Sequence, residues 1–339
     1  GGERLKSYSV GISGVGSFVP EKVLTNFDLS QIVDTNNEWI VERTGIEERR
    51  IAAKDIATSD LATESALNAL KDSKTRPEEI DLIIVATATP DHSFPSTACI
   101  VQKNIGAINA AAFDLNAGCT GFVYGLSTGA NFIKAGIYEK VLVIGGETLS
   151  RIVNWKDRNT CVLFGDGAGA CILERCEENY GILGYELGSD GTNYESLIQP
   201  GGGSKEPASV ESLANNLHYL HMDGKEVFKF AVKAMESSSM KALSLANMSL
   251  DDLDYLVPHQ ANIRIIDSAR KRLNLSEDKV YVNLNKYGNM SSASIPVALD
   301  EAIKNHKIKK GDSVLFVAFG AGLTWGSIIL RWSKEEKDV

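Results

Sequence analysis

Apolar runs alternate with amphipathic stretches along the chain, and this alternation predicts a layered α/β fold. Residues 80–87, 140–145 and 313–318 are almost continuous runs of apolar side chains, as in strands that are covered on both faces. Helix-like stretches such as residues 60–72 and 298–306 precede strands of this kind. Sheets with helices on both sides would bury such strands.

Part of this pattern occurs twice in the same order. Segments 81–86, 141–146 and 165–173 resemble segments 254–259, 314–319 and 320–330, respectively. Chance similarity between apolar strands is the alternative, but the shared order favours an internal duplication. A chain of 339 residues is also long for one simple core. We therefore predict two related halves, residues 1–176 and 177–339, joined between Glu174 and Tyr180.

One segment departs from the regular pattern. Residues 193–216 include the proline- and glycine-rich stretch 200–207, which is typical of a loop. We expect this segment to be an excursion on the surface. The charged residues 334–339 are expected to form a frayed tail.

Composition and charge narrow the function classes. The net charge of −9 argues against nucleic-acid binding, because such binding needs a basic face. No apolar run approaches the ~20 residues of a membrane span, and residues 1–6 lack the apolar core of a secretion signal. The cysteine number is odd and no paired metal-ligand spacing occurs, which favours a reduced, cytoplasmic compartment. The cysteines are Cys99, Cys119, Cys161, Cys171 and Cys176.

Cys119 is the strongest candidate for a nucleophile. The apolar segment 111–115 leads into small residues, then Cys119, and then a helix-like stretch over residues 121–134. A helix N-terminus favours negative charge, so this position is expected to lower the pKa of the thiol. Gly118 and Gly121 allow a sharp turn and close approach of a ligand. A buried structural cysteine in a tight turn is the alternative.

Three further segments carry polar groups after apolar runs. His259 ends an apolar strand, where polar groups of α/β proteins usually face a crevice. Asn289 lies in a polar, glycine-containing loop before a helix. The small residues 319–322 follow another strand and could point backbone N–H groups at an oxyanion. A structural histidine, a turn asparagine and a plain β-turn are the respective alternatives.

Together these motifs resemble the β-ketoacyl-acyl-carrier-protein synthase III family of condensing enzymes, within the thiolase superfamily. The resemblance covers nearly the whole chain, and several motifs in the right order make it specific. They are Glu38-Trp39-Ile40-Val41-Glu42-Arg43-Thr44-Gly45-Ile46, Asn116-Ala117-Gly118-Cys119-Thr120-Gly121-Phe122, Phe164-Gly165-Asp166-Gly167-Ala168-Gly169-Ala170, Pro258-His259-Gln260-Ala261-Asn262, Tyr287-Gly288-Asn289-Met290-Ser291-Ser292-Ala293-Ser294 and Phe319-Gly320-Ala321-Gly322.

The resemblance implies a five-layered α/β/α/β/α fold, a homodimer and a two-step reaction. Cys119 would take an acyl group from acyl-CoA, with the N–H groups of Cys119 and Ala321 as the oxyanion hole. His259 and Asn289 would then hold the enolate formed when malonyl-acyl-carrier protein loses carbon dioxide. Many relatives have Gly where this chain has Ala321, but a backbone donor survives that change. We expect no metal and no redox cofactor.

The resemblance also assigns residues to the substrates and partners. Trp39 and Arg158 would stack on the adenine of CoA from either side, and Arg43 and Asn262 would contact the nucleotide or the pantetheine. Phe94 would reach across the dimer to close the acyl pocket of the partner. An acidic carrier protein would dock on a basic cluster, although a solvated charged face is the alternative. The cluster is Lys229, Arg264, Arg270, Lys271 and Arg272.

The same residues are compatible with other functions. A related condensing enzyme could prime a polyketide or a specialised lipid, because primer and extender are not readable from the residues. Asn289 argues against elongating synthases, which use two histidines, and no cysteine follows Cys176, which argues against a thiolase. A cysteine thioesterase would need a water-activating base. A non-catalytic binding protein would have no need of Cys119, His259 and Asn289 together.

Overall fold

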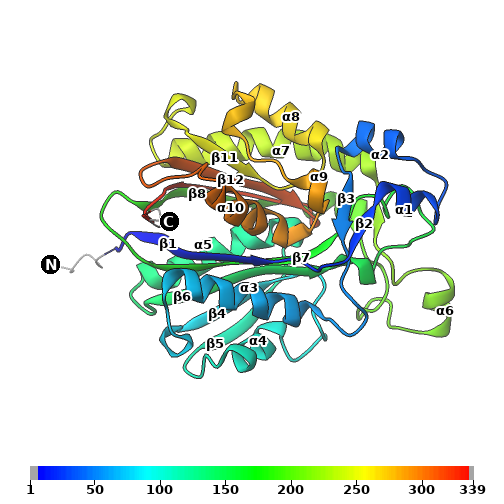
Figure 1. The fold of residues 1–339 in the computed structure, drawn as a ribbon, viewed down its shortest axis with the longest axis horizontal. Coiled ribbons are helices and arrows are strands. Elements are labelled where there is room, and N and C mark those ends of the chain that lie inside the picture. Colours follow the sequence, from blue (N-terminus) through cyan, green and yellow to red (C-terminus); the bar gives the residue numbers. More distant parts are fainter. Residues whose placement is uncertain (1–6, 336–339) are drawn as a thin grey trace.

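The computed structural model describes residues 7–335, so residues 1–6 and residues 336–339 of the predicted frayed tail lie outside it. Two main sheets are stacked with helices below, between and above them (Figure 1). In residues 7–335 no helix has the length and hydropathy to cross a bilayer. The same residues contain no group of three or more His, Cys, Asp or Glu side chains arranged to hold a metal ion.

The first sheet is built from the first half of the chain. In spatial order its strands are β1 (Val10–Phe18), β7 (Asp166–Arg175), β6 (Lys140–Thr148), β4 (Leu82–Ala86) and β5 (Ala111–Leu115). The strands β4, β5 and β6 run parallel, whereas β7 is antiparallel to both β6 and β1. The strand β5 therefore lies at one edge.

The second sheet repeats this arrangement. Its order is β11 (Tyr255–Pro258), β12 (Ser313–Gly320), β13 (Thr324–Arg331) and β8 (Gly181–Ser189), with β11 and β12 parallel and the others antiparallel. A single parallel bridge from Leu256 to Val280 takes the place of β5. The repeat read from the sequence is thus confirmed in the strand order. The boundary between residues 176 and 177 falls in the connection from β7 to β8 and stays a prediction.

Helices complete the five layers. The helices α3 (Thr58–Ser73) and α4 (Thr97–Ile105) cover the outer face of the first sheet, and α7 (Gly224–Leu245) and α8 (Ile263–Arg272) cover that of the second (Figure 1). Between the sheets lie α5 (Gly121–Lys134) and α10 (Ser294–Lys304). These two helices are apolar on several faces because both sheets contact them.

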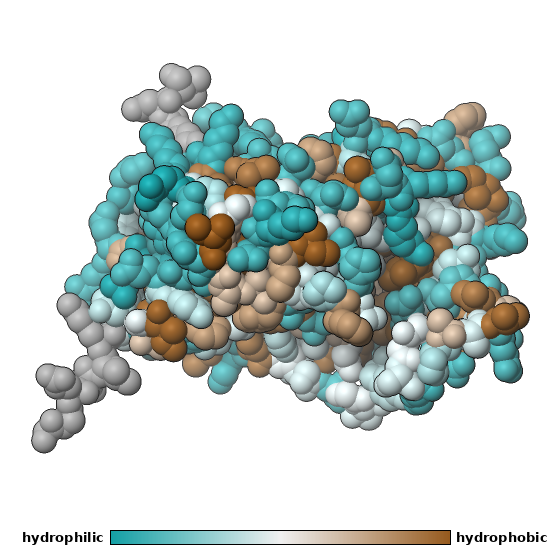
Figure 2. All heavy atoms as spheres, turned by 90° about the horizontal axis from the view of Figure 1, so that it is seen from below, coloured by the Kyte–Doolittle hydropathy of each residue, from teal (hydrophilic) through white to brown (hydrophobic). Residues whose placement is uncertain are grey.

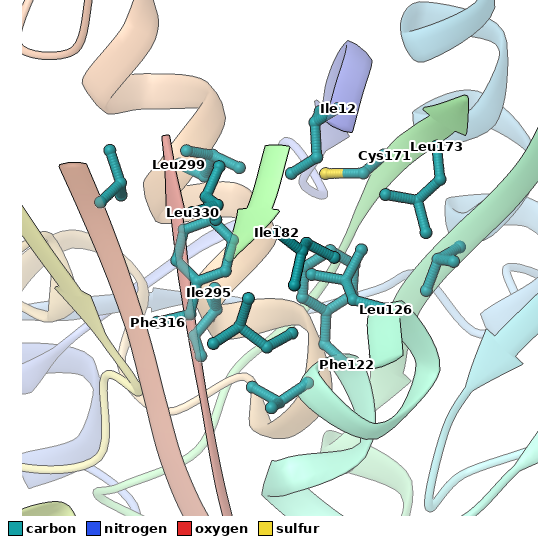
Figure 3. Packing of buried hydrophobic residues seen from close by; sticks show 14 of the residues in the cluster. Ile12, Phe122, Leu126, Cys171, Leu173, Ile182, Ile295, Leu299, Phe316 and Leu330 are labelled. Atoms are coloured by element: carbon teal, nitrogen blue, oxygen red, sulfur yellow. The ribbon is translucent and has the colours of Figure 1, made fainter. Parts of the chain in front are cut away.

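The largest apolar core fills this central layer. Phe122 and Leu126 of α5 meet Ile295 and Leu299 of α10, and strand residues such as Phe316 close the cluster (Figure 3). All five side chains are at most 2% exposed. The central layer therefore joins the two halves through apolar packing, and each outer layer has a core of its own.

Smaller elements lie around this stack and in its connections. The predicted surface excursion is irregular over residues 200–207, as expected, but its flanks form short elements that the sequence did not indicate: η4 (Gly191–Ser196), β9 (Leu197–Ile198), α6 (Val210–Ala214) and β10 (His221–Met222). The remaining elements are β2 (Val23–Thr25), α1 (Asn26–Ser30), α2 (Asn37–Thr44), β3 (Glu48–Arg50), η1 (Pro77–Glu79), η2 (Gly118–Thr120), η3 (Leu149–Arg151), η5 (Leu250–Asp252), η6 (Glu277–Lys279), α9 (Leu284–Tyr287) and η7 (Ser291–Ala293).

Candidate active site

A pocket of about 790 Å³ brings together the three predicted reacting residues and three of the predicted CoA-binding residues. Cys119 comes from the first half of the chain, whereas His259 and Asn289 come from the second, and all three line this pocket. Trp39, Arg43 and Asn262 line it as well. The pocket thus connects the proposed reacting residues with residues suited to hold a nucleotide.

Cys119 lies in the short turn η2, between β5 and the first residue of α5. Gly118 has φ +55°, and a side chain there would come within 2.9 Å of the Ala321 nitrogen. A side chain on Gly320 would come within 2.6 Å of the Cys119 nitrogen. The turn with the nucleophile and the loop after β12 therefore approach each other at backbone distance, which only glycine permits.

The expected lowering of the Cys119 pKa is wrong for the free protein. Burial is the main cause and raises the pKa to about 12, and the negative charge of Glu147 adds to it. A hydrogen bond with Ser291 acts in the opposite direction without outweighing burial. At neutral pH Cys119 is therefore a thiol, and its attack on a substrate needs a proton acceptor.

His259 is held in the neutral form. It follows β11, its backbone N–H donates to the Val317 oxygen at 2.8 Å, and its side chain is 1% exposed. Burial lowers the pKa of the imidazole to about 3. Neither ring nitrogen has a hydrogen-bond partner among residues 7–335, and the ring packs edge-on against Phe319. One nitrogen is thus free to donate and the other to accept.

The side chain of Asn289 is oriented by its own loop. The Ser291 N–H donates to its Oδ1 at 2.8 Å, which fixes the oxygen and leaves the NH₂ group to donate into the pocket. The backbone is held on both sides, because its N–H donates to the Leu163 oxygen at 2.8 Å and its oxygen accepts from the Gly165 N–H at 3.0 Å. Two neutral donors, His259 and Asn289, therefore line one pocket.

Two arginines contact Trp39, which lines the part of the pocket suited to hold a nucleotide. The guanidinium carbon of Arg43 lies 4.3 Å from the centre of the indole ring, and that of Arg158 lies 5.3 Å away. A base could enter between Trp39 and Arg158 only if this contact opened. The side chain of Asn262 caps α8 by accepting from the Arg264 N–H, and its amide donates to the Arg43 oxygen at 3.0 Å.

Four of the five residues of the predicted basic cluster are exposed, and the fifth is not. Arg264, Lys271 and Arg272 are exposed on α8, and Lys229 is exposed on α7. Arg270, by contrast, is 15% exposed and donates to the Leu275 oxygen and to Glu277. Its charge is occupied within the fold, so it does not share the face presented by the other four.

Phe94 is fully presented to solvent, at 86% exposure, in the loop before α4. In Figure 2, which views the molecule from the side where β5 and α4 lie in Figure 1, apolar side chains gather in the middle of the face. Ile108, in the turn that leads to β5, is 75% exposed.

Glu147 and Ser291, which influence the pKa of Cys119 in opposite directions, were not among the residues predicted from the sequence. Glu147 is fully buried at the end of β6. A carboxylate at the end of an otherwise apolar strand was the signal that could have identified it.

Comparisons with known proteins agree with this geometry. Residues 113–191 match the family described as 3-oxoacyl-[acyl-carrier-protein (ACP)] synthase III, and residues 243–332 match its C-terminal family. The chain is 60% identical to the β-ketoacyl-[acyl-carrier-protein] synthase III of Caldanaerobacter subterraneus subsp. tengcongensis over 96% of this chain and 98% of the relative.

Solved structures give the same result. The 3-oxoacyl-[acyl-carrier-protein] synthase III of Aquifex aeolicus VF5 has a TM-score of 0.89 and 47% identity, covering 95% of this chain and 100% of that one. The priming β-ketosynthase of the R1128 polyketide biosynthetic pathway has a TM-score of 0.90 and 33% identity, covering 99% and 100%. The chain therefore has the thiolase-type fold and belongs to the β-ketoacyl-[acyl-carrier-protein] synthase III family.

Proposed function

We propose that this chain is the initiating condensing enzyme of fatty-acid synthesis, with Cys119 as the acyl carrier and His259 and Asn289 as the groups that stabilise the enolate. The observation that carries this proposal is the pocket itself. It holds a cysteine at a helix start and two neutral donors, and it extends to an indole ring flanked by guanidinium groups.

In the first half-reaction, the Cys119 sulfur attacks the thioester carbon of an acyl-CoA. The N–H groups of Cys119 and Ala321 receive the developing negative oxygen, and the contact of Gly118 with the Ala321 backbone supports this pairing. Coenzyme A leaves as its thiolate and takes a proton from solvent. Trp39, Arg43, Arg158 and Asn262 hold the nucleotide and pantetheine during this step.

In the second half-reaction, malonyl-acyl-carrier protein loses carbon dioxide in the same pocket. The enolate oxygen accepts hydrogen bonds from the His259 imidazole and the Asn289 amide, and a neutral histidine donates without losing its proton. The enolate carbon then attacks the acyl-Cys119 thioester. The products are 3-ketoacyl-acyl-carrier protein and free Cys119.

These residues supply the nucleophile and all the donors that the two steps need. The reaction is therefore proposed to run on acyl-CoA and malonyl-acyl-carrier protein without a metal or a redox cofactor. We place it in the cytoplasm, where such substrates are made and where the five free cysteines stay reduced.

The proposed carrier-protein site lies on the exposed basic residues beside the pocket. Arg264 links α8 to α2, since its Nε donates to the Glu42 oxygen, and Lys271 follows two helical turns later on the same face. Lys229 extends the positive surface, and Arg272 does so while it also donates to Glu236 at 2.6 Å. An acidic carrier protein would be drawn to this patch although the whole chain carries −9.

The proposed assembly is a homodimer. The edge strand β5 and the exposed Phe94 and Ile108 lie on one side of the first sheet, and an exposed sheet edge with large apolar neighbours favours pairing with a second copy. Phe94 would then enter the partner and close its acyl pocket. Cross-linking combined with Phe94→Ser, which should weaken the dimer, tests this arrangement.

Intact-protein mass spectrometry tests the function directly. Mixing with a panel of straight and branched acyl-CoAs should add one acyl mass to the wild type and none to Cys119→Ala. Malonyl-acyl-carrier protein should then discharge the adduct into a 3-ketoacyl product. If the adduct decays to free acid instead, the chain is a thioesterase, and if no acyl-CoA reacts, the primer comes from another donor or the assignment is wrong.

A second candidate is priming of a polyketide or specialised lipid. The observation in its favour is the likeness to the R1128 priming ketosynthase, whose TM-score of 0.90 at 33% identity stands beside 0.89 at 47% identity for the Aquifex aeolicus synthase. The same acyl-CoA panel separates the two, because the rank order of primers in the mass spectrum reports the pathway that the pocket suits.

A further inference from the structure

Arg49 is a fully buried arginine that the mechanism above does not use. It lies in β3, its side chain is 0% exposed, and burial lowers the pKa of its guanidinium to about 10, which leaves it charged at neutral pH. Arginine is seldom buried completely unless the fold uses its donors. The role of Arg49 must therefore lie in the groups that its guanidinium contacts inside the protein.

The guanidinium joins two segments that lie far apart in the sequence. Its Nη1 donates to the Leu24 oxygen at 3.1 Å and to the Oδ1 of Asn26 at 2.9 Å, and its Nη2 donates to the Val162 oxygen at 2.8 Å. All three acceptors are neutral oxygens, and Nε has no partner among residues 7–335. One planar, rigid group therefore holds both segments at a fixed spacing.

Asn26 continues this connection to helix α2, which carries Trp39. The Asn26 side chain is 1% exposed, and its amide donates to the Oδ1 of Asn37 at 3.1 Å and to the Ile46 oxygen at 2.7 Å. Asn37 is the first residue of α2, and Ile46 lies two positions after its last residue. Both ends of the proposed nucleotide-binding helix are therefore anchored on the side chain that Arg49 holds.

Val162 is followed directly by the residues that hold the backbone of Asn289. The Leu163 oxygen accepts from the Asn289 N–H at 2.8 Å, and the Gly165 N–H donates to the Asn289 oxygen at 3.0 Å. The stem of Arg49 packs against the same segment, because a side chain on Gly165 would come within 3.1 Å of the Arg49 Cβ. The bond from Arg49 to Val162 therefore lies one residue away from the contacts that place Asn289.

We propose that Arg49 is a positioning residue that fixes helix α2 and the Asn289 loop relative to each other. This proposal rests on the proposed function, in which α2 and Asn289 act in different half-reactions. Acyl-CoA has a nucleotide for α2 to hold, whereas malonyl-acyl-carrier protein has none, and Asn289 acts only when the enolate forms. Loss of the Arg49 fork should therefore impair both steps, and loss of Asn26 should impair only the first.

Two variants, each measured in both half-reactions, test this assignment. Arg49→Lys keeps a positive charge but replaces the fork with a single flexible ammonium, which cannot hold both segments at once. It should raise the KM for acyl-CoA about tenfold and slow discharge of the preformed acyl-enzyme by malonyl-acyl-carrier protein about tenfold or more. Asn26→Ala should raise the KM for acyl-CoA about tenfold, while its acyl-enzyme discharges at the wild-type rate.

Mass spectrometry follows discharge per molecule of acylated enzyme, so an unfolded fraction does not change the rate constant. If Arg49 is merely structural, Arg49→Lys lowers the melting temperature and the acylated fraction but keeps the wild-type KM and discharge rate constant, and the proposal is wrong. Equal slowing of discharge in Asn26→Ala would refute the separation of the two connections. If the wild type forms no acyl adduct, the proposed function fails, which is a different result.

Hydrogen exchange provides a second test that does not depend on the folding of Arg49→Lys. Adenosine 3′,5′-bisphosphate corresponds to the nucleotide end of CoA and lacks the pantetheine that would reach Asn289 itself. Its binding to the wild type should slow amide exchange in the peptides that contain Gly165 and Asn289, because α2 and this loop share one support. The effect should be lost in Asn26→Ala. Unchanged exchange in the saturated wild type would overturn the proposal.

Discussion

Protonation of His259 should couple the stability of the fold to pH. The imidazole has a pKa of about 3 in the folded chain because it is buried, against an ordinary value of 6.5. Between pH 6.5 and pH 3, His259 is therefore protonated in the unfolded chain but stays neutral in the folded chain. The free energy of unfolding falls as pH drops from 6.5 toward 3.

The size of the effect depends on how far the pH lies below the ordinary pKa of histidine. About pH 5 lies roughly 1.5 units below it, and each unit is worth about 1.4 kcal/mol, so His259 alone should cost roughly 2 kcal/mol there. Urea denaturation at about pH 7.5 and about pH 5, at one protein concentration, measures the total change. The same pair of measurements on His259→Gln removes this contribution and keeps those of all other groups.

We expect the wild type to lose about 2 kcal/mol more than His259→Gln between the two pH values. The comparison within each protein cancels any packing defect of the variant. Equal losses would refute the idea that His259 stays neutral in the fold. The role of His259 as an uncharged donor would then need revision, because an imidazolium would hold the enolate by charge.

The other predictions concern the reacting loop and the carrier protein. Asn289→Ala should lower the condensation rate by about 10²–10³-fold, the usual cost of one lost donor to an oxyanion, while acyl adducts on Cys119 still form in the mass spectrum. Gly320→Ala should slow acylation at least about tenfold, since a Cβ 2.6 Å from the Cys119 nitrogen must displace the turn; a normal rate would show that the turn adapts. Arg264→Glu should raise the KM for malonyl-acyl-carrier protein about tenfold and reduce its salt dependence, with acylation by acyl-CoA unchanged; an equal loss in both steps would place Arg264 elsewhere.

Much of the fold could be predicted because its strands are buried on both faces and therefore read as apolar runs. Helix α5 was predicted with its observed limits, since Gly121 and Lys134 bound a clear apolar pattern. The elements α6 and β9 were missed because they are short and are stabilised by their surroundings rather than by periodicity.

The reacting residues could be predicted from sequence motifs, but properties that depend on burial in the fold could not. Cys119, His259 and Asn289 could be placed in one pocket from their motifs. The pKa of Cys119 could not, because its direction depends on desolvation and on Glu147, a residue 28 positions away in the chain. Likewise only the structure shows that Arg270 turns away from the other basic residues to Glu277.

Because the two halves of the chain each contribute part of the pocket, catalytic activity is sensitive to small changes in how the halves pack together. Cys119 belongs to one half, and His259 and Asn289 belong to the other, so their alignment depends on the central apolar layer that contains Phe122 and Leu299. A slight loosening of that layer would leave both sheets and their helices folded while it separates the reacting groups. Turnover should therefore report early damage to this enzyme before circular dichroism registers any change.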